Sequence, residues 1–164
     1  MTKLNLLACQ LVSCPDIDDN FIQLEQQLQR LSEIKQYDPT LPTLMVLPES
    51  FAIFGGGAEL NLKHQEVLGE GPIQSRLAAL AKQYQLWIVA GTLPTTSSVV
   101  DKFLATSAVF DPAGELVAHY QKIHLFDVDV NDGVGSYRES DNTHPGQHVC
   151  VIKTPIGNIG MAVC

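Results

Sequence analysis

The segment Thr43-Leu-Met-Val-Leu-Pro48 is a continuous apolar run of strand length, and it decides the fold class of this 164-residue chain. A run of this kind is typical of a strand that is buried on both faces of a sheet. Residues 86–93, with the sequence LWIVAGTL, form a second such run. Both segments therefore predict interior strands, and a first core strand is expected at residues 3–12.

Two helices are predicted on either side of the Thr43–Pro48 segment, from apolar residues spaced three and four apart. The first covers residues 16–37 and is opened by Pro15 and Asp16, which are typical of a helix start. The second begins at Pro72 and carries its apolar stripe up to Tyr84. Strands and helices therefore alternate through the first half of the chain.

The second half of the chain has short strands joined by turns. Residues 103–110 and 115–121 flank the turn sequence Asp111-Pro-Ala-Gly114, which predicts a hairpin. Residues 149–153 and 156–163 form a further pair, and residues 127–147 are expected to be a long polar loop. This order of elements predicts one α/β domain over residues 1–164, with a mixed sheet.

Composition excludes several classes of partner. Ten Lys and Arg against eighteen Asp and Glu give a net charge of −8, which repels a phosphate backbone, so no nucleic acid is expected. No apolar run reaches the roughly 18 residues of a membrane helix. No secretion signal is expected at the N-terminus, because Asn5 interrupts its apolar run. A cytoplasmic protein is therefore expected, with free thiols at Cys9, Cys14, Cys150 and Cys164.

Common cofactor and catalytic motifs are missing from the sequence. No C-x-x-C pair provides zinc ligands, so no metal site is expected. The three glycines at 55–57 are not followed by Lys and Ser or Thr, so they predict a flexible turn and not a phosphate loop. No G-x-S-x-G elbow is present, which excludes the common serine hydrolases.

Three reactive side chains follow predicted strands. Glu49 follows LMVLP, Lys122 follows ELVAHYQ, and Cys164 follows GNIGMAV. Ligands of α/β sheets bind outside the carboxyl ends of the strands. Each residue alone has an ordinary explanation, as a turn carboxylate, a surface lysine or a small buried hydrophobe. Their shared position favours a catalytic site.

Four motifs in order extend this interpretation: LPES at 47–50, YQKIHLF at 120–126, RESDNTHPG at 138–146 and GNIGMAVC at 157–164. With these motifs the chain resembles the nitrilase-like carbon–nitrogen hydrolases over essentially its whole length. The amino-acid sequences of the second and third motifs are most similar to those of amidases that act on deaminated glutathione and ω-amides. The resemblance implies a four-layer α-β-β-α sandwich with mixed sheets, of which this chain is the N-terminal part.

The resemblance also assigns catalytic roles. Cys164 would attack an amide carbonyl as a thiolate and form a thioester, and Glu49 would be the general base. Lys122 would stabilise the oxyanion, and Glu139 would position Lys122 and the substrate. Thiol, base and ammonium complete the set for acyl transfer, so no cofactor is expected. The implied partners are a small-molecule amide and further copies of the chain, in a homodimer or larger homo-oligomer.

The substrate pocket is expected after Glu49 and in the polar loop. Phe51 and Phe54 are candidates for one pocket wall, although both are equally consistent with ordinary core positions. Arg138 is the only arginine in the candidate loops, and it is expected to bind a substrate carboxylate.

Two functions remain open at this point, an amidohydrolase and a catalytically silent truncated fragment or interaction module of the same fold. In the family, the chain beyond the nucleophile supplies a backbone N–H for the oxyanion and further strands. An isolated 1–164 polypeptide is expected to have negligible amidase activity, because a terminal carboxylate at Cys164 would raise the thiol pKa and repel the oxyanion.

Overall fold

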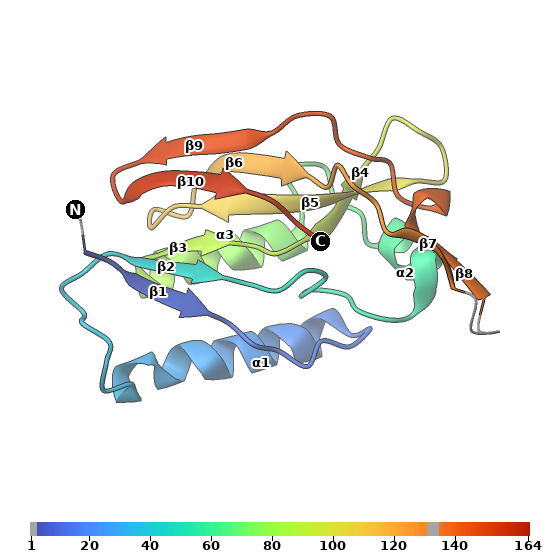
Figure 1. The fold of residues 1–164 in the computed structure, drawn as a ribbon. Coiled ribbons are helices and arrows are strands. Elements are labelled where there is room, and N and C mark those ends of the chain that lie inside the picture. The colour runs from blue at the N-terminus through green and yellow to red at the C-terminus, as the bar shows by residue number, and fades with distance from the viewer. Residues whose placement is uncertain (1–2, 131–134) are drawn as a thin grey trace.

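A computed structural model describes residues 3–130 and 135–164, and it is built around one six-stranded mixed sheet (Figure 1). The strands of this sheet lie in the order β1-β2-β3-β5-β4, and β6 pairs with β5. They are β1 (Asn5–Ala8), β2 (Thr43–Val46), β3 (Leu86–Val89), β4 (Leu93–Thr96), β5 (Phe103–Phe110) and β6 (Leu116–Gln121). The helices are α1 (Ile17–Gln29), α2 (Gly57–Lys63) and α3 (Pro72–Tyr84). The predicted α/β class with a mixed sheet is confirmed.

The parallel half of the sheet positions the hydrophobic core. β1, β2 and β3 run parallel, and Leu7, Met45 and Ile88 lie side by side across them. These side chains belong to one core cluster with the buried faces of α1 and α3, so both helices cover the same face of the sheet. The buried helix residues in this cluster are Phe21, Leu24, Leu28, Ile73, Leu77, Leu80 and Ala81.

The first strand and the first helix are shorter than predicted. β1 ends at Ala8 because its partner β2 ends at Val46, two residues before Pro48, which has no N–H to donate. The helix predicted over residues 16–37 begins as expected, with the Asp16 carboxylate accepting the Asp19 N–H over 3.0 Å. Regular α-helix ends at Gln29, and a 3-10 helix covers Arg30–Glu33. The apolar stripe continues beyond it to Ile34, but that side chain is exposed and does not pack on the core.

The strand predicted over residues 86–93 is divided into β3 and β4 by a bulge. Both halves pair with β5, but three residues, 90–92, lie opposite only two, 107–108. A bulge of this kind adds a residue to one strand and bends it. At its centre Gly91 has a φ of 39°, and a Cβ there would lie 1.8 Å from the carbonyl oxygen of Pro48. The bulge therefore lets the chain that leaves β2 pass close to β4.

The loop predicted over residues 127–147 contains regular structure, so that prediction is wrong in part. β7 (Asp127–Val130) and β8 (Gly135–Arg138) pair antiparallel, and a 3-10 helix, η2, covers Glu139–Asp141. Residues 131–134 lie outside the described residues. The ribbon was missed because its sequence is polar and its strands are short. The helix α2 was also missed, although the glycines before it do form the predicted turn with positive φ angles.

Both predicted hairpins are confirmed. β5 and β6 pair antiparallel, and the Asp111 carboxylate closes their turn by accepting the N–H groups of Ala113 and Glu115. β9 (Cys150–Thr154) and β10 (Gly157–Met161) form the second hairpin, which runs alongside β6 (Figure 1). The residues after β10 approach Val46 and Val89, on the sheet face opposite α1 and α3. Within residues 3–130 and 135–164, no helix is long and apolar enough to cross a membrane.

The close approach at Gly91 gives a test of this packing. Gly91→Ala is expected to lower the free energy of unfolding by about 2 to 4 kcal/mol, because the added methyl group clashes with Pro48 and the positive φ disfavours alanine. Urea denaturation measures the change. Gly160→Ala is the matched control, because its Cβ would meet no atom within 4 Å. Equal unfolding curves for the two variants would show that the contact at Gly91 is not tight.

Candidate active site

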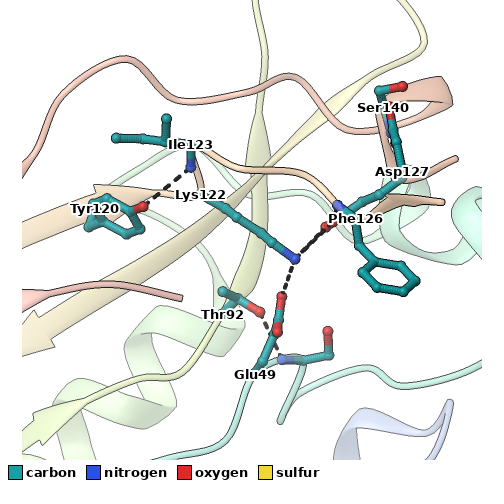
Figure 2. A network of polar contacts seen from close by, with 10 residues as sticks. Glu49, Thr92, Tyr120, Lys122, Ile123, Phe126, Asp127 and Ser140 are labelled. Carbon is teal, nitrogen blue, oxygen red and sulfur yellow. Dashed lines mark hydrogen bonds and ion pairs between the residues drawn. The ribbon is translucent and has the colours of Figure 1, made fainter. Parts of the chain in front are cut away.

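A buried ammonium group lies at the centre of the candidate site. The Nζ atom of Lys122 lies 2.7 Å from Glu49 Oε1 (Figure 2). It also lies 2.8 Å from Glu139 Oε2. The lysine side chain is 4% exposed, whereas those of Glu49 and Glu139 are 35% and 22% exposed. The structure therefore brings together three of the four residues that the sequence indicated as catalytic.

The backbone of Lys122 is fixed from two sides. Lys122 directly follows β6, and its N–H donates to the Ala105 carbonyl of β5 over 2.9 Å. Its own carbonyl accepts the N–H of Gly146 over 2.8 Å. A Cβ at Gly146 would lie 2.2 Å from the Gln121 carbonyl oxygen, so only glycine lets this segment come so close. These contacts fix the backbone of Lys122, and with it the direction in which the lysine side chain leaves the sheet.

Glu49 is positioned by the end of β2. The Leu47 N–H donates to the Val89 carbonyl over 2.9 Å, which continues the pairing of β2 with β3 by one residue. The carbonyl of Pro48 then passes Gly91 at the bulge. Glu49 follows immediately, and its carboxylate reaches Lys122 across the carboxyl ends of the strands.

Glu139 is positioned by reciprocal hydrogen bonds with Phe126. The N–H of Glu139 donates to the Phe126 carbonyl over 3.2 Å, and the Phe126 N–H donates to Glu139 Oε2 over 2.7 Å. The carboxylate of Asp127 accepts the Ser140 N–H over 3.0 Å, and this hydrogen bond lowers the pKa of Asp127. The β7–β8 ribbon and η2 therefore bring Glu139 to a lysine 17 residues earlier in the chain.

The two carboxylates keep Lys122 charged. Burial is the largest single influence and lowers its pKa, but the hydrogen bonds and negative charges of Glu139 and Glu49 outweigh burial and raise the pKa overall. Lysine supplies three N–H donors, and the described residues accept two of them through these carboxylates. The third N–H has no acceptor among the described residues.

A cavity of about 240 Å³ opens beside this cluster, and both Glu49 and Glu139 line it. Its walls come from α2, β4, β5 and the segment after η2. The apolar lining includes Ile53, Leu93 and Phe103, and the polar lining includes Asn61, Thr92, Asn142 and Thr143. None of these lining residues was predicted from the sequence. The run of polar residues directly after Glu139 was an available signal for Asn142 and Thr143, whereas Asn61 lies on the unpredicted helix α2.

Cys164 lies at a second, smaller hollow of about 170 Å³, which Glu49 also lines. Val46 and Val89 from the sheet and Ser107 from β5 form the other wall. The thiol is free and exposed. Glu49 is therefore the residue that adjoins both the hollow at Cys164 and the larger cavity.

The residues expected to bind substrate lie elsewhere. Phe51 is buried in the core and packs edge-on against Phe21, with ring centroids 5.9 Å apart, which is the ordinary core position that the sequence left open. Phe54 is exposed, and neither phenylalanine lines the cavity. The guanidinium of Arg138 lies 2.8 Å from the carboxylate of Asp129, and Arg138 does not line the cavity either.

The donor set of the site is suited to acyl transfer. A thiol, a carboxylate that adjoins it and an ammonium group can act as nucleophile, base and electrostatic stabiliser. Among the residues that the structure describes, no group of three or more His, Cys, Asp or Glu is arranged to hold a metal ion.

Comparison with known proteins identifies the class to which this site belongs. Residues 8–164 match the carbon-nitrogen hydrolase family, so the chain belongs to that family. It is 39% identical over 165 residues to a deaminated glutathione amidase of Yersinia enterocolitica. This alignment covers 100% of the chain and 55% of the Yersinia protein. It is also 35% identical over 124 residues to the omega-amidase NIT3 of Saccharomyces cerevisiae, covering 74% of this chain and 42% of that protein.

The fold agrees with this assignment. The crystal structure of Saccharomyces cerevisiae Nit3, a member of branch 10 of the nitrilase superfamily, matches with a TM-score of 0.79 and 28% identity. The match covers 99% of this chain and 56% of the yeast chain. The chain thus spans about half the length of these relatives, and the family predicted from its motifs is confirmed.

A titration of Lys122 tests the electrostatics of the cluster. Carbon-13 NMR of labelled lysine should give a midpoint above the ordinary value of about 10.4. In the double variant Glu49→Gln, Glu139→Gln the midpoint should fall below that value, because burial is then no longer offset. Equal midpoints in the two proteins would show that the carboxylates do not hold the charge.

The direction of this shift also fixes its effect on stability. Because the pKa is raised in the folded state, the stabilisation is fully present below the pKa of the unfolded chain. It is lost as the pH rises through the higher pKa of the folded state.

Proposed function

We propose that the protein is an amidohydrolase that cleaves a non-peptide C–N bond of a small linear amide through a thioester on Cys164. The observation that carries this proposal is the buried Lys122 ammonium between Glu49 and Glu139, with Glu49 also adjoining the hollow at Cys164. The relatives named as deaminated glutathione amidase and omega-amidase support these two substrate types.

The first half of the reaction forms the thioester. Glu49 accepts the thiol proton of Cys164, and the sulfur attacks the amide carbonyl to form a C–S bond. The carbonyl oxygen becomes an oxyanion, which the third N–H of Lys122 stabilises. When the C–N bond breaks, Glu49 returns the proton to the nitrogen, so ammonia or an amine leaves as a neutral molecule.

The second half of the reaction restores the enzyme. Glu49 accepts a proton from water, and the resulting hydroxide attacks the thioester carbonyl. The C–S bond breaks, the carboxylic acid leaves, and Cys164 recovers its proton from Glu49. Glu139 does not exchange protons in this scheme, and its role is to keep Lys122 charged and in place.

The shape of the cavity supports a small substrate. A volume of about 240 Å³ holds only a short chain, and the lining combines apolar side chains with the amide groups of Asn61 and Asn142. Recognition of a substrate carboxylate by Arg138 would require its guanidinium to leave Asp129. The amide N–H groups of the two asparagines can donate to such a carboxylate without breaking an existing ion pair.

The remaining features of the proposal follow from the same chemistry. The reaction uses no metal or organic cofactor, because thiol, carboxylate and ammonium supply every step. Residues 1–164 are then the N-terminal portion of the hydrolase domain, in line with the 55% share of the Yersinia relative. Free cysteines fit the cytoplasm, and the fold class favours a homodimer or larger homo-oligomer.

Two substitutions in the full-length protein test the proposal. Cys164→Ala is expected to abolish ammonia release from an ω-amide, and Glu49→Gln to lower kcat by about 100-fold or more, the usual contribution of a general base. Both variants should keep the circular dichroism spectrum of the wild type. Coupled detection of ammonia measures the rates.

Matched controls separate these effects from general damage. Cys150→Ala removes a thiol of β9 that lines neither cavity, and Glu70→Gln removes an exposed carboxylate. Both should retain wild-type rates. Amide hydrolysis that survives Cys164→Ala would contradict the thioester mechanism, and a wild-type protein without activity on any ω-amide or deaminated glutathione would favour the catalytically silent alternative.

A further inference from the structure

The residue that follows Glu49 has an unusual backbone conformation. Ser50 has a φ of 55°, in the left-handed region that disfavours any residue with a Cβ atom. Two other described residues share this feature, but Gln85 caps the end of α3 and Asp101 lies in an exposed turn. Ser50 instead lines the candidate active-site cavity. Such strain persists where the surrounding structure dictates the backbone, so the contacts that hold Ser50 bear directly on Glu49.

The hydroxyl group of Thr92 holds this strained residue. The Ser50 N–H donates to Thr92 Oγ1 over 2.8 Å. Thr92 is 4% exposed and lies in the bulge between β3 and β4, directly after Gly91. Gly91 accommodates the carbonyl of Pro48, the residue before Glu49. The bulge therefore contacts the chain on both sides of Glu49, with Gly91 before it and Thr92 after it.

Glu49 depends on this backbone contact because its side chain is not enclosed. The Glu49 side chain is 35% exposed, and the described residues give its carboxylate one ion pair, with Lys122. The N–H that Thr92 accepts belongs to the peptide group that Glu49 and Ser50 share. A rotation of this peptide changes ψ of Glu49 and φ of Ser50. It therefore shifts the course of the backbone from which the Glu49 side chain reaches the hollow at Cys164.

We propose that Thr92 is a positioning residue, whose hydroxyl group locks the Glu49–Ser50 peptide so that Glu49 adjoins both Lys122 and Cys164. This inference rests on the proposed function, because it concerns the direction of the general base. Thr92 acts through Ser50 and does not exchange protons with the substrate. The strain at Ser50 is the reason that the hydrogen bond is needed, since without it the serine relaxes to a negative φ.

Three variants of the full-length protein test this proposal. Thr92→Val removes the hydroxyl group at nearly constant volume, and Thr92→Ser keeps it. Thr92→Val combined with Ser50→Gly removes the hydroxyl group but also removes the cost of the positive φ. For each protein, kcat and KM for an ω-amide are measured together with the rate at which iodoacetamide alkylates Cys164, read from the mass of its peptide. Urea denaturation checks that each variant is folded, and Thr92→Ala replaces Thr92→Val if valine prevents folding.

Thr92→Val is expected to lower kcat by about 10- to 100-fold, the effect of a catalytic group displaced by about 1 Å. KM should change by less than kcat, about 3-fold at most, because Thr92 is only one of several polar residues that line the cavity. Alkylation of Cys164 should slow, because Glu49 no longer accepts its proton. Thr92→Ser should retain most of the activity, and the double variant should recover most of what Thr92→Val loses.

Two results would overturn the proposal. One is a folded Thr92→Val protein with wild-type kcat and alkylation rate, and the other is a double variant as slow as Thr92→Val alone. A wild-type protein that hydrolyses no amide would contradict the proposed function instead. In that case the alkylation rates still decide the role of Thr92, because they require no substrate.

Discussion

The ammonium group of Lys122 has to be charged in a place from which water is almost absent, and much of the site follows from this constraint. Removing such an ion from water costs several kcal/mol, and the cost is offset only when opposite charges lie within hydrogen-bonding distance. The compensating carboxylates come from positions 73 and 17 residues away in the sequence. The ion therefore ties the end of β2, the end of β6 and the 3-10 helix η2 to one point.

The sheet supplies the accuracy that this arrangement needs. Parallel pairing brings the ends of β2 and β3 to one edge, and the bulge at Gly91 lets the segment that carries Glu49 cross that edge without a clash. On the other side, pairing of β5 with β6 fixes Lys122, and the ribbon of β7 and β8 delivers Glu139. Cys164 and Glu49 line the same hollow, although they lie 115 positions apart in the sequence.

The elements with a strong local pattern could be predicted from the sequence. Pro72 and the stripe that follows it define α3, and Asp111-Pro-Ala-Gly114 defines the β5–β6 turn. The bulge could not be read from LWIVAGTL, because its cause is the approach of Pro48 from another part of the chain. Among the site residues, Glu49, Lys122 and Cys164 stand at strand ends, and Glu139 came from the family resemblance. Thr92 and Asn61 gave no signal, since their importance depends on what the fold places opposite them.

The thioester on Cys164 is the step of the proposed reaction that can be observed most directly. Rapid acid quenching of the working protein with an ω-amide, followed by mass spectrometry of its peptides, observes this species directly. We expect a peptide containing Cys164 whose mass is increased by the acyl part of the substrate, that is, by the mass of the substrate minus ammonia. Steady ammonia release with no acyl group on Cys164 at any quench time, or with the acyl group on Cys9, Cys14 or Cys150, would contradict it.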